Sequence, residues 1–383
     1  MSDRRRVLFV APWVPGRRRP RSLALLRSLQ ERADVRALVL VWNDHDAADA
    51  RELDGDVVAV RGRAVEGVWR AGRALLTRRS LQQAYADAGA MREAVRTSVR
   101  DFRPDAVFFN VIRSGQWLPL VGDLPVAFDL DEIRSEYYGQ VAARGRGPAR
   151  WVGRIEAPRM AAAEALVVAR AQSVLVSSPH DVADRATFHL VRSVPVPTPF
   201  RWDESRAVGG RLLFVGRLGY AANVEALEWF VEHVMPLLRA RGVPATLRIV
   251  GAEVSSRVSR LAAPDVEIVG PVADVGVEYA SAAVSVVPVR TATGVQMKLI
   301  ESLGVGTPTV ATRLCVELAG SAAEESCRTA DTPQEWADHI EQLLGSVRAR
   351  EAASASGRRW FESNYAPAAV EGAVSRALDA VDV

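Results

Sequence analysis

Cysteine and lysine are scarce in this chain of 383 residues. The two cysteines, Cys315 and Cys327, are too few for a disulfide framework, and we expect two free thiols in a reducing compartment. No apolar run approaches the roughly 18–20 residues that a membrane span requires. The apolar run Val7–Ala11 is too short for a secretion signal. These absences predict a cytoplasmic protein.

Two kinds of motif are also missing. No cluster of histidine, cysteine and carboxylate residues has the spacing of a metal site. No G-x-G-x-x-G follows the first predicted strand, which disfavours a dinucleotide-dependent oxidoreductase. We therefore expect neither a metal nor a bound cofactor.

Charge is distributed unevenly along the chain. Residues 1–200 contain 31 arginines and 23 acidic residues, a net charge of +8, whereas residues 201–383 carry a net charge of −5. A basic half suits either a phosphorylated acceptor or an anionic membrane surface, which for a cytoplasmic protein would be the inner face of the membrane. It is equally typical of an ordinary solvated surface. The arginines are scattered without an aromatic stacking motif, so we do not expect nucleic acid as a partner.

The hydrophobic pattern predicts two successive α/β domains. In the first half we expect strands at Arg6–Ala11, Val35–Val41, Val57–Val60, Asp105–Asn110, Val126–Leu130 and Ser173–Ser177, and helices at Ser22–Arg32, Leu81–Phe102 and Arg154–Arg170. In the second half we expect strands at Arg211–Gly216, Thr246–Gly251, Val266–Val269, Val284–Pro288 and Thr309–Thr312. Helices are expected after Asn223, a predicted N-cap, and at Gly294–Leu303, Pro333–Leu344 and Ala353–Asn364.

A proline-dense stretch, Val194–Pro199, cannot be helical and predicts the linker between the domains. We place the first domain at residues 1–198, the second at residues 199–360 and a final helix at residues 361–383. Ligands of parallel sheets bind at the carboxyl ends of the strands. We therefore expect the site in a cleft between the two domains.

Lys298 is the only lysine in the chain, so every other basic residue is an arginine. It lies in Thr291–Glu301, which leads from a predicted strand into a predicted helix and contains Gly294. The free amides of a helix N-terminus bind phosphate, and Lys298 in the second turn would add a charged contact. Glu301 on the same helix face could accept hydrogen bonds from ribose hydroxyls. The alternative interpretation is a surface ion pair between Lys298 and Glu301.

Arg217 directly follows a predicted strand that ends at Gly216. A guanidinium at this end of the sheet can hold a diphosphate bidentately and stabilise its charge as it leaves. A Gly-Arg pair after a strand is by itself weak evidence for a phosphate site. It gains weight because Lys298 is expected at the same end of the same sheet.

Taken together, these segments resemble the retaining glycosyltransferases of family 4. The resemblance covers Leu213–Arg217, Asn223–Phe230, Leu247–Gly251, Val269–Val275 and the segment from Lys298 to Thr312. It is closest to the exopolysaccharide-associated branch, where a tyrosine and an asparagine follow the Gly-Arg pair, here Tyr220 and Asn223. The first half is more loosely similar, at Pro15-Gly16, Arg21-Ser22 and Asp129-Leu130-Asp131.

The resemblance implies the GT-B fold, in which two Rossmann-like domains face each other across a cleft and a final helix crosses back to the first domain. It implies a nucleotide-sugar donor and a glycan, lipid-linked or small-molecule acceptor. Arg217 and Lys298 would clamp the donor diphosphate and Glu301 would hold the ribose. The remaining contacts that the resemblance implies are made by the backbone. The backbone of Gly270, Pro271 and Val272 would meet the base, and the amides of Gly294 and Val295 would meet the phosphate or sugar. Gly16 would lie on the acceptor side.

Three positions depart from the family pattern. Thr293 replaces the first glutamate of the family, Ala222 replaces a lysine, and Pro197–Phe200 replaces an Asn-Gly turn. The first two changes are common in the closest branch, so we interpret them as subfamily character. They also motivate the alternative of a non-catalytic, nucleotide-binding scaffold.

A retaining enzyme of this kind needs no dedicated nucleophile, because the leaving phosphate oxygen can take the acceptor proton. Asp129 and Asp131 end a predicted strand and could orient acceptor hydroxyls, although one of them could equally cap a helix. Arg113 and Ser114 follow the neighbouring predicted strand. A further alternative is a pyridoxal phosphate enzyme that uses Lys298 as its Schiff base.

Overall fold

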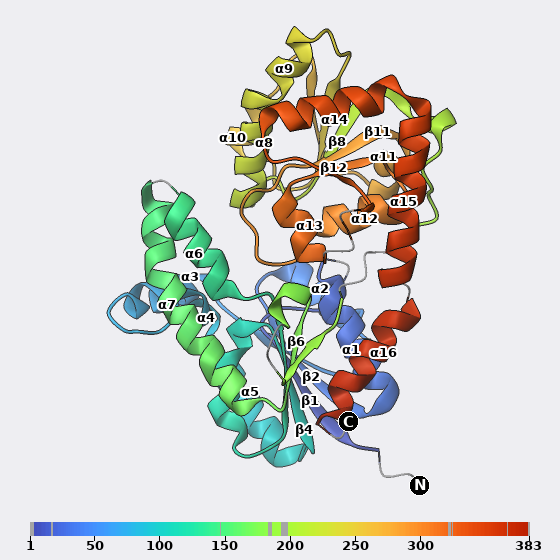
Figure 1. The fold of residues 1–383 in the computed structure, drawn as a ribbon. Helices are drawn as coiled ribbons and strands as arrows, with labels where there is room; N and C mark the ends of the chain where they lie inside the picture. The colour runs from blue at the N-terminus through green and yellow to red at the C-terminus, as the bar shows by residue number, and fades with distance from the viewer. Residues whose placement is uncertain are drawn as a thin grey trace. The chain divides into compact units, whose positions relative to one another are not determined.

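The structure is a computed structural model that describes residues 4–16, 18–145, 147–182, 186–192, 198–320, 323, 325–365 and 367–381. The chain divides into two compact units, residues 1–194 with 367–383 and residues 195–366. Each unit is built on its own parallel sheet with helices packed against it (Figure 1). Most of the predicted linker lies outside the described residues.

The first unit contains a seven-stranded sheet with the order β3-β2-β1-β4-β5-β6-β7. Its strands are β1 (Arg6–Ala11), β2 (Asp34–Val41), β3 (Asp56–Arg61), β4 (Ala106–Asn110), β5 (Val126–Asp131), β6 (Ser173–Val176) and β7 (Phe188–Leu190). Its helices are α1 (Pro20–Arg32), α2 (Asp44–Arg51), α3 (Ala64–Ala74), α4 (Leu81–Ala86), α5 (Gly89–Asp101), α6 (Arg134–Arg144), α7 (Gly147–Arg170) and α16 (Pro367–Asp379), with 3₁₀ segments η1 (Ile112–Val121) and η2 (Pro179–Asp181).

The core of the first unit comes from strands that are buried on both faces, as is typical of a parallel sheet. Side chains of β1 and β2 such as Phe9 and Val39 pack against Leu25 and Leu29 of α1. The C-terminal helix α16 adds Leu378 to the same core and lies beside α1 (Figure 1). The end of the chain therefore belongs structurally with its beginning.

The second unit contains a six-stranded parallel sheet with the order β10-β9-β8-β11-β12-β13. Its strands are β8 (Val208–Val215), β9 (Thr246–Val250), β10 (Val266–Gly270), β11 (Ala282–Val287), β12 (Thr309–Ala311) and β13 (Arg328–Thr329). Its helices are α8 (Ala221–His233), α9 (Met235–Ala240), α10 (Ser256–Ser259), α11 (Val275–Ser281), α12 (Met297–Val305), α13 (Arg313–Ala319), α14 (Pro333–Gly345) and α15 (Val347–Tyr365), with η3 (Glu204–Arg206) as a 3₁₀ segment.

The predicted strands are confirmed to within a few residues, whereas several helix predictions are wrong in detail. The stretch predicted as one helix at Leu81–Phe102 is two helices, because the chain leaves the helical conformation at Asp87 and Ala88. Asp87 is buried there and accepts hydrogen bonds from Arg79 and Arg92. Asn223 does not cap a helix, since α8 begins at Ala221 with Tyr220 as its N-cap.

Candidate functional site

In each unit the strand order reverses at one point in the sheet. In the second unit the reversal falls between the neighbouring strands β8 and β11, and in the first unit it falls between β1 and β4. The loops after two such strands leave in opposite directions and open a crevice at the carboxyl end of the sheet, where ligands bind in open α/β folds. Arg217 follows β8 and Lys298 follows β11, so both flank this point.

Asn223 connects the two predicted cations of the second unit. Its side-chain oxygen accepts from Lys298 Nζ at 3.1 Å, and its Nδ2 donates to the carbonyl of Arg217 at 2.9 Å. Gly216 leaves room for this arrangement, because a Cβ there would lie 2.9 Å from Asn223 Nδ2 and 3.3 Å from Lys298 Cε. Asn223 thus bridges the two residues, whereas the sequence indicated only a helix cap and a position shared with the resembling branch.

The helix after β11 begins later than predicted. Gln296 has an extended backbone, so α12 starts at Met297 and Lys298 lies in its first turn rather than in the second. No side chain caps this helix end. Gln296 instead bonds to both sides, donating to the carbonyl of Gly294 at 3.1 Å and accepting from Lys298 Nζ at 3.2 Å. The ammonium group is therefore nearer to the free amides of the helix N-terminus than the sequence indicated.

Lys298 and Glu301 bond to separate partners rather than to each other. Glu301 accepts from the hydroxyl of Tyr279 at 3.1 Å, whereas Lys298 bonds to Asn223 and Gln296. Burial lowers the pKa of Lys298, partly offset by the negative charge of Glu301. Burial raises the pKa of Glu301 to about 6, and Tyr279 and Lys298 act in the opposite direction. A simple surface ion pair does not describe this geometry.

Arg217 is exposed, with 57% of its side-chain surface accessible. Its Nε lies 3.5 Å from a carboxylate oxygen of Glu253, which is equally exposed. Such a pair in solvent contributes little stability, about 0–1 kcal/mol. The guanidinium can therefore exchange this partner for an anionic ligand at small cost.

The other predicted donor contacts lie at the same end of the sheet. Thr293 and Gly294 are buried in the loop before α12, and Val295 is half-buried. Gly270 ends β10 with a φ of 82°, and its carbonyl accepts from the amide of Gly251 at 2.8 Å. After it, Pro271 is exposed, whereas Val272 packs against the core. Thr291, not predicted, has a buried hydroxyl without a hydrogen-bond partner in the described part of the chain.

The corresponding point of the first unit carries a cationic cluster around Trp13. The guanidinium of Arg19 lies 4.7 Å from the centre of the Trp13 ring, and that of Arg113 lies 5.6 Å from it. Arg113 donates to the neutral side chain of Gln82 at 3.2 Å. Burial, together with the nearby charge of Arg134, lowers the pKa of Arg113 to about 10. Gly16 lies in the same loop as Trp13, and a Cβ at this position would meet no other atom within 4 Å.

Asp129 and Ser114 lie deeper than the sequence suggested. Asp129 is fully buried and accepts from Arg21 at 2.6 Å and from Asn110 at 2.9 Å. Burial raises its pKa to about 6, and the charge of Arg21 opposes this shift. Ser114 is also buried and donates to the carbonyl of Val111. Neither side chain has exposed surface with which to contact an acceptor directly in this structure.

Asp131 differs from Asp129 although it ends the same strand. Its backbone φ is +65°, which turns the chain away from the strand direction. Its carboxylate lies 3.3 Å from Arg21 Nε but keeps 39% of its side-chain surface accessible. Of the two predicted aspartates, Asp131 is therefore the one that solvent and ligands can reach.

Within the described ranges, no group of three or more histidine, cysteine or carboxylate side chains is arranged to hold a metal ion. A search of the described helices finds none that is both long enough and apolar enough to cross a membrane.

Comparison with known proteins bears on both units. Residues 209–346 match the model of the family described as glycosyl transferases group 1. The structure of HepE from Anabaena in complex with UDP and glucose has a TM-score of 0.66 at 14% identity, covering 97% of this chain and 99% of that one. Sucrose-phosphate synthase from Thermosynechococcus elongatus has a TM-score of 0.70 at 17% identity, covering 98% and 100%. No curated protein matches the chain.

These likenesses show the GT-B fold, with two Rossmann-like α/β domains, and so confirm the expected fold class. The glycotransferase of kitacinnamycin has the same fold, with a TM-score of 0.58 at 18% identity over 98% of this chain and 100% of that one. The family match includes Gly216, Arg217, Asn223, Lys298 and Glu301. It supports placing the second unit in the group 1 glycosyltransferase superfamily.

Proposed function

We propose that this protein is a retaining glycosyltransferase of family 4 that transfers a sugar from a nucleoside-diphosphate sugar to a hydroxyl group. The observation that carries the proposal is the cluster of Arg217, Asn223 and Lys298 at the reversal point of the second unit. This cluster lies inside the segment that matches glycosyl transferases group 1. A point charge and a guanidinium beside an uncapped helix N-terminus form a site suited to a diphosphate.

The proposed division of labour follows from exposure and charge. Arg217 and Lys298 hold the two phosphates of the donor, and the amides of Gly294 and Val295 lie in the adjoining loop. Glu301, already oriented by Tyr279, accepts hydrogen bonds from the ribose, and the backbone of Gly270 to Val272 lies against the base. In the first unit, Gly16, Arg113 and Asp131 form the acceptor side.

In the proposed reaction, the bond between the anomeric carbon and the phosphate oxygen breaks and the acceptor oxygen bonds to the same face of the sugar. The acceptor proton passes to the leaving phosphate oxygen, so no separate base is required. Arg217 and Lys298 stabilise the charge that develops on the departing diphosphate. We propose that these two cations meet that charge without a metal ion.

A thermal-shift panel tests the donor site. UDP is the first candidate, because the Anabaena protein was crystallised with it. GDP, TDP, CMP and the common sugar conjugates follow. A ligand at 100 times its dissociation constant should stabilise the native protein by roughly 2.7 kcal/mol. We expect one nucleotide family to raise the melting temperature of the wild type and to lose this effect in Lys298→Ala and Arg217→Ala.

Arg239→Ala is the matched control. Arg239 is similarly exposed and pairs with Asp265 at 2.6 Å, but it lies near the opposite, amino-terminal end of the sheet. Loss of the shift in this variant as well would mean that the cluster has no special role. No shift with any nucleotide would remove the donor-site proposal and favour a scaffold that keeps the fold without binding a nucleotide.

Release of free nucleoside diphosphate then tests turnover. Proton NMR of the product tests whether the anomeric configuration is retained, and unchanged turnover in EDTA tests the independence from metal. A product with inverted anomeric configuration would refute the retaining assignment but would leave the donor-site proposal intact.

A further inference from the structure

Helix α3 of the first unit presents apolar side chains to solvent. Val65, Trp69 and Leu76 have 84%, 63% and 90% of their surface accessible, and Val68 and Leu75 are also exposed. With a helical repeat of 3.6 residues, Val65, Val68 and Trp69 lie along one stripe of α3, and Leu75 and Leu76 follow in the turn after the helix ends at Ala74. A contiguous stripe of this kind marks an interaction surface more often than isolated exposed residues do.

The opposite side of α3 already has a partner. Gly67 packs so closely on α4 that a Cβ would lie 2.9 Å from the ring of Tyr85, and Ala74 is buried. Arg70 donates to the backbone of Tyr85 from the same side. The apolar stripe is therefore not a misplaced core face, because the helix buries its other face.

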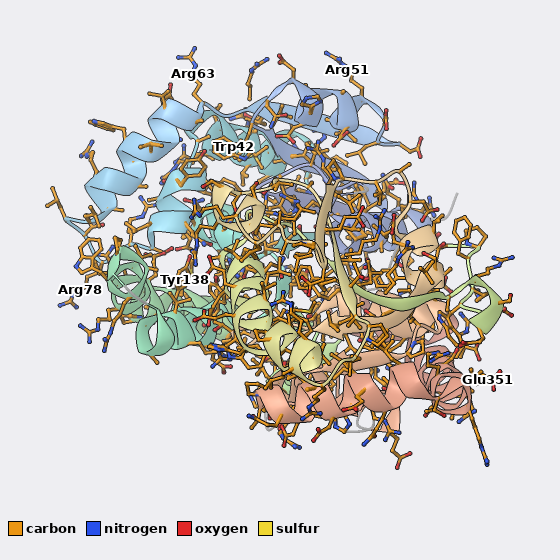
Figure 2. The ribbon with its side chains drawn as sticks, turned by 90° about the horizontal axis from the view of Figure 1, so that it is seen from above. Trp42, Arg51, Arg63, Arg78, Tyr138 and Glu351 are labelled. Carbon is orange, nitrogen blue, oxygen red and sulfur yellow. The ribbon has the colours of Figure 1, made fainter. Side chains whose placement is uncertain are left out.

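The charges around the stripe are strongly positive. Residues 63–79 contain five arginines and one glutamate, a net charge of +4. Glu66 pairs with Arg63 and Arg70, and Arg79 pairs with Asp87. Among the described residues, Arg73 and Arg78 pair with no carboxylate, and the guanidinium of Arg73 lies 4.8 Å from the centre of the Trp69 ring. Figure 2 shows Arg63 and Arg78 directed outward at the two ends of the segment.

We infer that this segment, residues 63–79, is a docking surface for an anionic lipid bilayer. A helix with tryptophan and valine on its free face, exposed leucines directly after it and arginines beside them lies in the interface of a membrane with its apolar side chains among the lipids. The unpaired arginines select the bilayer as occupant, because a second copy of this basic surface would repel it whereas anionic headgroups complement it. The inference goes beyond the proposed transferase activity and does not depend on the donor site.

Vesicle flotation with the full chain tests the inference. We expect the protein to float with vesicles of phosphatidylcholine and phosphatidylglycerol, and much less with phosphatidylcholine alone or at high salt. The variant Arg73→Gln/Arg78→Gln should bind the anionic vesicles about 25-fold more weakly, at about 5-fold per arginine. Trp69→Ser/Leu76→Ser should abolish binding, whereas Trp69→Phe should retain it.

Matched controls lie on exposed positions elsewhere. Arg51→Gln/Arg359→Gln removes two exposed arginines outside the segment, and Val277→Ser removes an exposed apolar side chain of the second unit. Circular-dichroism melts establish that each variant is folded. Absence of flotation in the wild type, or equal binding by the segment variants and the controls, would overturn the inference. Sedimentation that shows a dimer lost in Trp69→Ser/Leu76→Ser would also overturn it and assign the surface to a second copy.

Discussion

Replacement of Asn223 by alanine tests whether one amide organises the donor site. The side chain is 5% exposed and makes two hydrogen bonds, one to the ammonium of Lys298 and one to the carbonyl of Arg217. A bond to a charged group contributes about 1.5–3 kcal/mol and a neutral one about 1 kcal/mol. Lys298 is half-buried, so water recovers part of the first bond. The better helix propensity of alanine returns only about 0.5 kcal/mol.

We therefore expect Asn223→Ala to lower the free energy of unfolding by about 2–3 kcal/mol. In a unit of this size that corresponds to about 5–10 °C in melting temperature. Donor affinity should fall as well, because Lys298 and the Arg217 backbone are no longer held together. Without the amide oxygen as acceptor, the pKa of Lys298 should be lower still. As the pH rises, Lys298 should therefore lose its charge, and the protein its donor affinity, at a lower pH in the variant than in the wild type.

Calorimetry with and without the nucleotide identified by the thermal-shift panel measures both effects. Asn364→Ala is the control, because Asn364 also makes a side-chain bond to a backbone carbonyl, that of Trp360 at 2.9 Å, but is hydrogen-bonded to no cation in the described part of the chain. It should cost about 1 kcal/mol and leave donor affinity unchanged. An Asn223→Ala protein that melts and binds the nucleotide like the wild type would refute the positioning role.

Three further outcomes are expected. Gly216→Ala should displace the two side chains packed against it, Asn223 and Lys298, and lower the free energy of unfolding by about 1–3 kcal/mol. Titration calorimetry should show a greater loss of free energy in donor binding than in folding. Unchanged donor affinity would contradict the crowding at this glycine. Affinity for a nucleoside-diphosphate sugar should fall several-fold as the pH drops from about 7.5 to 5, because protonation of Glu301, with a pKa of about 6, removes the acceptor for the ribose hydroxyls. Glu301→Gln should bind with an affinity that does not change over this range. If wild type and Glu301→Gln show the same pH dependence, Glu301 does not hold the ribose. Arg21→Met should leave Asp129 buried without its cation and cost about 3–5 kcal/mol near pH 7. Arg21 lowers the pKa of Asp129 against the effect of burial, so in the variant this pKa should rise above the wild-type value of about 6. The cost should therefore be nearly constant below about pH 6 and grow as the pH rises above it in urea titrations; a cost independent of pH across this range would refute this.

The positions of the proposed donor-site residues in the fold could be predicted from the sequence because these residues follow strand ends. Strands β8 and β11 are short apolar runs, and the residues after them are Arg217 and the Lys298 segment. In parallel sheets the carboxyl ends of strands meet at one edge, so this local pattern brings distant residues together. The role of Asn223 did not follow, because asparagine near a helix start predicts a cap equally well. Only the hydrogen bonds of Asn223 to Lys298 and to the carbonyl of Arg217 reveal the bridge.

In the first unit the sequence analysis placed Asp129 and Asp131 at the correct end of the strand but did not predict how deeply each side chain is buried. Asp129 and Asp131 both end β5, and nothing in their order shows which one is enclosed. The arginine that buries against Asp129 is Arg21, distant in the chain and placed on α1 by the packing of that helix onto the sheet. The bend at Asp131, where φ is +65°, then directs its carboxylate toward solvent.

The sequence by itself determined the two parallel sheets, the order of their elements and the segments that carry the cations, because hydrophobic periodicity and strand-end position are local properties of the chain. Only the tertiary structure decided where α12 begins, which aspartate is buried and which face of α3 remains uncovered. These depend on contacts between residues far apart in sequence, whose burial and hydrogen bonding no local pattern records.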